Sequence, residues 1–175
     1  MICPHCLKPI DGAEPVRLWE HDLTPGLVHT LRKFAIAVGR AGHNDVHLAR
    51  DIERLGDYMK DVYEIHRILP AGIDRARLQE TLVGRSRSLD DLLARIAQVF
   101  REGDEEDARD IIARARQVAA GAENSIVELS RSTIPSGEAV CLALALRFYK
   151  RIALHMTNVA TCVVVPVDRM DFYDE

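Results

Sequence analysis

Aromatic residues are scarce in this chain, at 5% of its 175 residues, and no run of arginine and lysine alternates with them. Proteins that bind single-stranded nucleic acid stack the bases on aromatic side chains. Nucleic-acid binders also carry a basic patch, whereas the formal net charge here is -4. The composition therefore argues against a nucleic-acid partner and favours cations, small molecules or proteins.

Long apolar runs are also missing. The most apolar stretch, 139–146, ends at Arg147, which is too short to cross a bilayer, because a spanning helix needs about 20 apolar residues. Met1 is followed almost at once by Cys3-Pro4-His5-Cys6 rather than by the apolar core of a signal peptide. We therefore expect a cytoplasmic protein with no membrane insertion.

The motifs of common enzyme classes are absent from the sequence. There is no G-x-x-x-x-G-K-[ST] or G-x-G-x-x-G phosphate cradle, and no glutamate stands three residues before any of the seven histidines. Helical bundles with a di-metal centre use that Glu-x-x-His spacing. We expect a protein that is not an enzyme, and a di-metal helical-bundle enzyme is the alternative.

Hydrophobic residues make up 47% of the chain and recur at steps of three and four, which is typical of amphipathic helices. Only 162–167 is β-branched enough to be ambiguous. The pattern predicts an all-α antiparallel bundle of about five helices. The expected helices cover 27–38, 44–69, 74–100, 104–129 and 138–165.

The chain divides into three parts by composition. Residues 1–25 are rich in proline and contain the Cys-x-x-Cys sequence, 26–166 form the helical domain, and 167–175 are an acidic tail. Within the domain, Gly103 predicts a helix end and Asp104 an N-cap, with acidic residues in the first turn that follows. Gly121 predicts a loosened turn in the helix that Asp104 begins.

Two helices share a pattern at a distance of 97 residues. The shift pairs Arg54 with Arg151, Leu55 with Ile152 and Gly56 with Ala153, in "IERLGDYMKDV" and "YKRIALHMTNV". With "GDEEDARDII" between them, these segments resemble the phosphate-uptake regulator family, the PhoU-like proteins. The resemblance implies tandem three-helix repeats, with 74–166 as a complete repeat and a truncated first one. The small residues predict close packing of the two helices.

The same resemblance implies a metal site at which Glu53 and Asp57 bind iron or another divalent cation. Carboxylates at i and i+4 project from adjacent turns and can share one hard cation. Asp61 extends the row by another turn, but Lys150 and Leu154 occupy the acidic positions of the second copy. Such a site is incomplete, completed by a dimer mate, or lost. The alternative is a solvated acidic edge.

Cys3 and Cys6 form half of a zinc knuckle. Tetrahedral zinc takes four ligands, so a second chain or nearby histidines would have to complete the site. A redox-labile pair and an ordinary terminus are the alternatives. Cys141 and Cys162 lie about 31 Å apart on one expected helix, at 1.5 Å per residue, so we expect buried free thiols.

His43 and His47 stand four residues apart, with Asp51 four residues further along the same stripe. Histidines at this spacing can bind zinc, but without an H-E-x-x-H sequence a partly exposed pair is the alternative. We expect His66 and His155 to be interhelical or core residues rather than ligands.

The function implied by the resemblance is that of a non-catalytic regulatory adaptor in phosphate-transport regulation or signalling. Its expected partner is a transporter or sensor protein, and the truncated first repeat favours a homodimer in which the second chain covers the exposed flank. A structural dimerising bundle that has lost metal binding is a further alternative.

Overall fold

The computed structural model describes residues 46–165, which form four long helices and no strand. The predicted all-α class is confirmed for this range. The predicted helix over 27–38, the N-terminal segment and the acidic tail lie outside the described residues. The long helices are α3 (Val46–Glu64), α5 (Gly84–Glu102), α6 (Glu105–Ser130) and α7 (Ser136–Val164).

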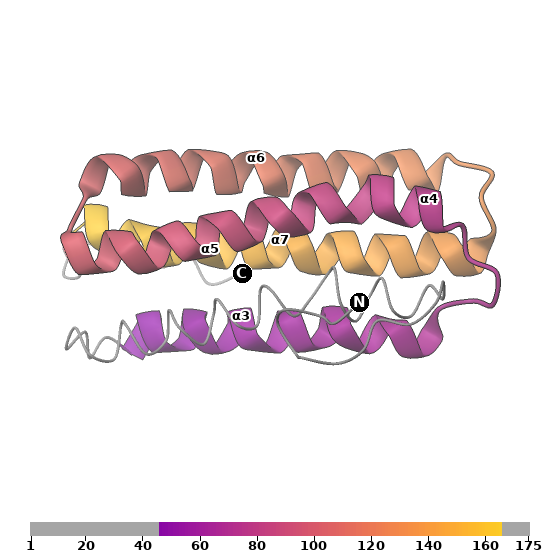
Figure 1. Cartoon of the computed structure of the whole chain (residues 1–175), viewed down its shortest axis with the longest axis horizontal. Helices are drawn as coiled ribbons and strands as arrows, with labels where there is room; N and C mark the ends of the chain where they lie inside the picture. The colour runs from indigo at the N-terminus through magenta and orange to yellow at the C-terminus, as the bar shows by residue number, and fades with distance from the viewer. Residues whose placement is uncertain (1–45, 166–175) are drawn as a thin grey trace, which may run out of the picture.

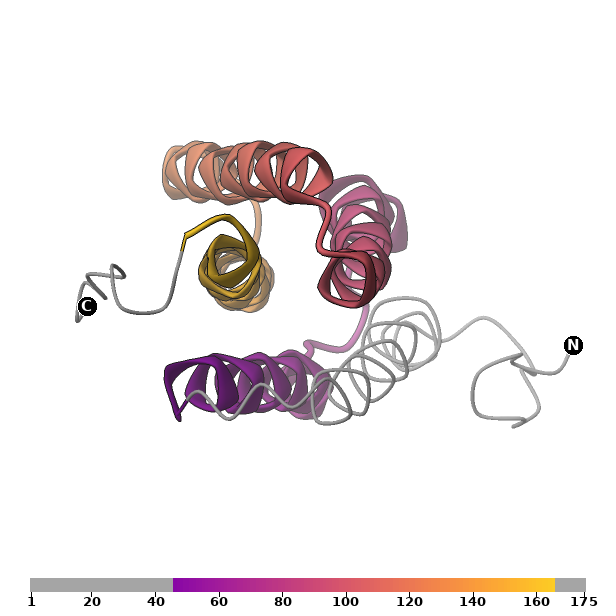
Figure 2. The same ribbon diagram turned by 90° about the vertical axis from the view of Figure 1, so that its left-hand side faces the viewer.

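Successive long helices run in opposite directions and lie side by side (Figure 1). Viewed end-on, α7 lies between α3 and α6, with α5 closing a third side (Figure 2). Helix α7 contacts all three of the others. The described part is therefore an antiparallel bundle whose last helix is central.

The central position of α7 follows from its apolar surface. Its buried side chains recur on every turn, so no single neighbour could cover them. They include Leu142, Leu146, Tyr149, Ile152 and Met156, none of which is accessible to solvent. Burial raises the pKa of the Tyr149 phenol, and the Ser86 hydroxyl opposes that rise.

The boundary between α5 and α6 is where the sequence places it. Gly103 adopts a left-handed conformation with φ of 69°, and its N–H donates to the Val99 carbonyl. Asp104 then caps α6, because its side chain accepts from the Asp107 N–H at 3.0 Å. Helix α6 continues unbroken through Gly121, so the predicted loosening at Gly121 is wrong.

The expected helix over 74–100 is interrupted by a change of winding. A short helix α4 (Arg75–Leu78) passes into a π-helical turn, η3 (Gln79–Val83), before α5 begins. The Arg85 guanidinium donates to the Thr81 carbonyl within this turn, so a side chain takes part in satisfying the irregular backbone. Nothing in the apolar spacing predicts the π-turn.

The connection between the 3-10 turn η2 (Ile65–Ile68) and α4 fixes the start of α7. Asp74 accepts hydrogen bonds from the Ala76 and Arg77 backbone N–H groups. Arg77 in turn forms an ion pair with Glu138, a buried carboxylate in the first turn of α7. This pair joins two chain segments far apart in sequence.

At its other end α7 remains helical to Val164, which resolves the ambiguity at 162–167 as far as the structure describes it. The predicted buried free thiol is confirmed at Cys141. Cys141 is buried, and burial raises the pKa of its thiol, whereas Cys162 is only half-buried. None of the described helices combines the length and apolarity required to cross a bilayer.

Replacing the N-cap of α6 tests the local account of this helix. We expect Asp104→Ala to lower the free energy of unfolding by about 1 kcal/mol, because an N-terminal N–H loses its acceptor. Asp104→Asn keeps an equivalent acceptor and is the matched control. Chemical denaturation measures both, and equal losses in the two variants would contradict the assignment.

Candidate functional site

Polar side chains of α3 and α7 meet along a partly buried seam between these helices. Asp51 is 8% exposed, and its Oδ1 lies 2.6 Å from the His155 Nδ1. The Asn158 amide donates to the same oxygen at 3.4 Å. An ionised carboxylate can only accept, so in that state the imidazole donates through Nδ1. One carboxylate thus holds two side chains of the opposite helix.

Tyr58 continues the seam two turns further along α3. Its ring stacks on His155, with centroids 5.4 Å apart, and on Phe148 at 6.1 Å. Arg151 donates to the Tyr58 hydroxyl at 2.9 Å, and its guanidinium carbon lies 5.5 Å from the ring centroid. The prediction that His155 is interhelical is confirmed.

These contacts relate the two copies of the repeated pattern. The 97-residue shift makes Asp51 equivalent to Phe148, and Tyr58 equivalent to His155. The contact between Asp51 and His155 is therefore equivalent to the contact between Phe148 and Tyr58. The predicted side-by-side packing of these helices is confirmed, and the helices run antiparallel.

The small residues do not make this packing, contrary to the prediction. Gly56 lies two residues before Tyr58, and Ala153 two residues before His155. Since two residues turn an α-helix by about 200°, both small residues face away from the seam. Ala153 is fully buried and Gly56 half-buried. Polar and aromatic side chains therefore make the described side-chain contacts of the seam.

The predicted acidic row lies on α3 outside the buried core. Glu53 and Asp57 are exposed and Asp61 is half-buried. Burial raises the pKa of Asp61, and the charges of Glu64 and Asp57 add to the rise. Negative charge at Asp61 is therefore unfavourable, although Lys60 partly compensates.

The described residues do not assemble a complete metal centre. Over 46–165, no group of three or more histidine, cysteine, aspartate or glutamate side chains is arranged to hold an ion. Cys3, Cys6 and His43 lie outside the described residues, as does the side chain of His47. Asp51, the third member of that histidine stripe, is bound to His155 instead.

In the second copy of the pattern, the positions that correspond to Glu53 and Asp57 are Lys150 and Leu154, and both contact the rest of the bundle. Lys150 forms an ion pair with Glu123 of α6 at 2.8 Å. Hydrogen bonding from Lys150 lowers the pKa of Glu123, and the charges of Lys150 and Arg147 lower it further. Leu154 is half-buried and packs against the core. The second copy therefore contacts α6 through the charged side chain of Lys150.

The chemistry open to the seam follows from its partners. An aspartate that orients an imidazole is a component of several hydrolytic sites, but here the carboxylate also accepts from Asn158 and the imidazole lies under the Tyr58 ring. The sequence contains no signal for the parts played by Tyr58 and Arg151, since their roles depend on the register of two distant helices. These contacts hold α3 and α7 together in one register.

Comparison of the chain with protein-family models, with curated proteins and with solved structures gives no significant match. The resemblance to the phosphate-uptake regulators therefore rests on the repeated pattern alone.

A double-mutant cycle tests the seam. We expect Asp51→Ala and His155→Ala to be coupled by at least about 0.5 kcal/mol in the free energy of unfolding, because the two side chains share a partly buried hydrogen bond. Glu53→Ala, on an exposed position of the same helix, is the control partner for His155→Ala. Coupling as large for the control pair would show that the effect is not specific to Asp51.

Proposed function

We propose that this protein is a non-catalytic regulatory adaptor of the phosphate-uptake regulator type, which acts in the cytoplasm by binding a transporter or sensor protein. The observation that carries the proposal is the antiparallel pairing of α3 and α7, the helices that contain the two motif copies. Equivalent residues of the copies make equivalent contacts across the seam, as expected if one unit was duplicated and its copies packed about a local two-fold axis.

The distribution of polar groups supports binding rather than catalysis. The polar side chains of the seam are engaged with the opposite helix: Asp51 with His155 and Asn158, and Tyr58 with Arg151. The exposed charges of α3 face outward, where a partner can reach them. An adaptor requires a rigid scaffold and an accessible surface, and this arrangement supplies both.

The acidic edge of α3 is the surface we assign to the partner, and we propose that a divalent cation binds there with it. Glu53, Asp57 and Asp61 would supply oxygen ligands, and the partner or a second copy of the chain would supply the rest. A homodimer that completes the site is consistent with the absence of acidic residues at Lys150 and Leu154 in the second motif copy.

Affinity capture from cells tests the adaptor proposal. We expect the full chain to retain a phosphate-transport component or its sensor, identified by mass spectrometry. We expect Asp57→Lys to reduce this capture at least tenfold, because charge reversal opposes a complementary partner. Glu106→Lys makes the same change at an exposed site on α6 and is the matched control. Capture of neither component, with both variants folded, argues against the proposal.

Cation binding has a separate test. The folded-state pKa of Asp61 is raised, so its carboxylate destabilises the fold at pH 7, and this penalty disappears as the pH falls below the normal value of 3.8. A cation bound at the edge relieves the penalty and should raise the melting temperature of the metal-free protein at pH 7.

We expect Asp57→Asn to abolish the stabilisation by Fe²⁺ or Mn²⁺, whereas Glu106→Gln keeps it. A saturating cation adds about 2.7 kcal/mol at one hundred times its Kd. Thermal melts with and without the metal measure the difference, together with elemental analysis of the purified protein. Equal responses in the two variants would rule out this edge as the binding site.

A further inference from the structure

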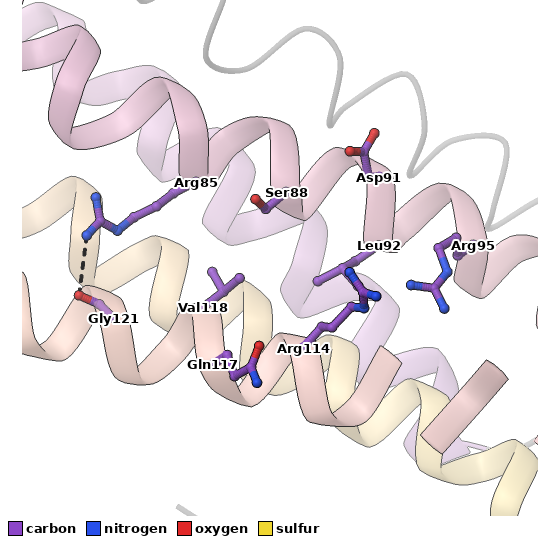
Figure 3. A pocket seen from close by; sticks show the side chains of 9 residues that line it. All are labelled: Arg85, Ser88, Asp91, Leu92, Arg95, Arg114, Gln117, Val118 and Gly121. Atoms are coloured by element: carbon purple, nitrogen blue, oxygen red, sulfur yellow. Dashed lines mark hydrogen bonds between the residues drawn. The ribbon is translucent and has the colours of Figure 1, made fainter. Parts of the chain in front are cut away.

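A groove of about 450 Å³ lies between α5 and α6 (Figure 3). Its volume lies within the range of about 300–1,000 Å³ that small-molecule sites occupy. Three arginines and one aspartate are its charged lining residues. The lining consists of Arg85, Ser88, Asp91, Leu92, Arg95, Arg114, Gln117, Val118 and Gly121.

Arg85 places a positive charge at one end of the groove. Its guanidinium donates to the Ser125 hydroxyl at 2.7 Å, to the Gly121 carbonyl at 3.4 Å (Figure 3) and to the Thr81 carbonyl. All three acceptors are uncharged. Among the described residues, no carboxylate lies within ion-pair distance of Arg85, although its side chain is held rigidly across the two helices.

Arg95 and Arg114 lie at the other end, where one carboxylate orients both. Asp110 accepts from the Arg114 Nε at 2.8 Å and from the Arg95 Nη2 at 2.7 Å. Arg95 also pairs with Asp107. The hydrogen bond from Arg95, followed by that from Arg114, lowers the pKa of Asp110, so the carboxylate stays ionised and holds the two cations together.

The two arginines keep donors available for a ligand. Arg114 uses Nε for Asp110, and its terminal nitrogens point into the groove (Figure 3). Its side chain is 62% exposed, so a ligand can reach it without a change in the fold. Asp107 and Asp110 are not among the lining residues. Apart from Asp91, the charged groups that line the groove are therefore guanidinium groups, and the two carboxylates that pair with Arg95 and Arg114 are not part of its lining.

The groove also has an apolar part between its charged ends. Leu92 is buried and Val118 half-buried, and both line it together with the polar Ser88 and Gln117. An inorganic ion would fill only a fraction of this volume, since one water molecule has a share of about 30 Å³. The dimensions suit an organic molecule with an anionic group at one end.

We propose that the α5–α6 groove binds a small phosphate monoester, with the phosphate held by Arg114 and Arg95 and the organic part lying along Leu92 and Val118 towards Arg85. Guanidinium forks match the geometry of phosphate oxygens and bind them bidentately. A phosphate monoester carries about −1.5 to −2 charge at pH 7 and three acceptor oxygens. Two adjacent arginines therefore suit a phosphate group better than they suit a ligand with a single carboxylate. The site is independent of the adaptor function proposed above.

Calorimetric titration of the full chain with AMP, glycerol 3-phosphate, inorganic phosphate, adenosine and succinate tests this site. We expect at least one of the two esters to bind, and to bind more tightly than inorganic phosphate. Adenosine lacks the anion and should not bind, and succinate should bind at least tenfold more weakly than the ester. Failure of both esters at millimolar concentration, or succinate binding as tightly as the esters, overturns the proposal.

Variants of matched exposure locate the ligand. We expect Arg114→Gln to weaken ester binding at least tenfold, whereas Arg116→Gln, an exposed arginine of α6 outside the groove, changes it less than twofold. Equal effects of the two substitutions would indicate nonspecific charge attraction and overturn the proposal. Arg85→Lys keeps the positive charge but loses the guanidinium group, which donates to acceptors on two helices. Circular dichroism therefore checks the fold of this variant before its titration. If the fold is intact, we expect Arg85→Lys to weaken ester binding. Unchanged affinity would contradict the proposal that the organic part of the ligand extends towards Arg85.

Discussion

The burial of α7 is the constraint on which the rest of the structure depends. This helix is apolar on most of its circumference from Leu142 to Ala160, and water around that surface would be unfavourable at roughly 25 cal/mol per Å². Three helices are needed to cover it, and α3, α5 and α6 do so. Short connections between long helices then leave the antiparallel order as the simple solution.

Within this apolar interior, a few polar contacts select one register. Asp51 can satisfy its carboxylate only when His155 and Asn158 of α7 lie opposite, because an unpaired buried polar group costs about 1–3 kcal/mol. Glu138 and Arg77 impose the same condition at the start of α7. Apolar burial thus drives association of the helices, while buried hydrogen bonds penalise sliding of one helix along another.

Two surfaces of the bundle present charged side chains of opposite sign. The exposed edge of α3 carries Glu53 and Asp57, whereas the α5–α6 groove is lined by Arg85, Arg95 and Arg114. The two surfaces suit ligands of opposite sign, a cation or basic partner at the first and an anion at the second. Because they lie on different helices, each can be altered without the other.

Local signals predicted a large part of this fold. Gly103 and Asp104 marked a helix boundary because a left-handed residue and a side-chain cap act within a few residues of chain. The apolar period predicted the long helices, including the break between the expected helices over 44–69 and 74–100. The same local logic was wrong at Gly121, where packing of α6 against its neighbours outweighs the intrinsic preference of glycine.

The candidate sites were predictable only in part. The acidic row at Glu53 and Asp57 follows from helical spacing, since residues four apart share one side of a helix. The arginine groove was not foreseen, because its residues come from two helices and are separated by up to 36 positions between Arg85 and Gly121. The pairing of Asp51 with His155 spans 104 positions and was likewise beyond any local pattern.

By itself, the amino-acid sequence determined the helices, their ends and the spacing of charges along each one, because these properties arise from interactions within a few turns. Only the tertiary structure decided which faces meet, that Gly56 and Ala153 turn away from the seam, and that three arginines share a groove. Those outcomes depend on the register and rotation of whole helices, which are settled by how the complete apolar surface of α7 is covered.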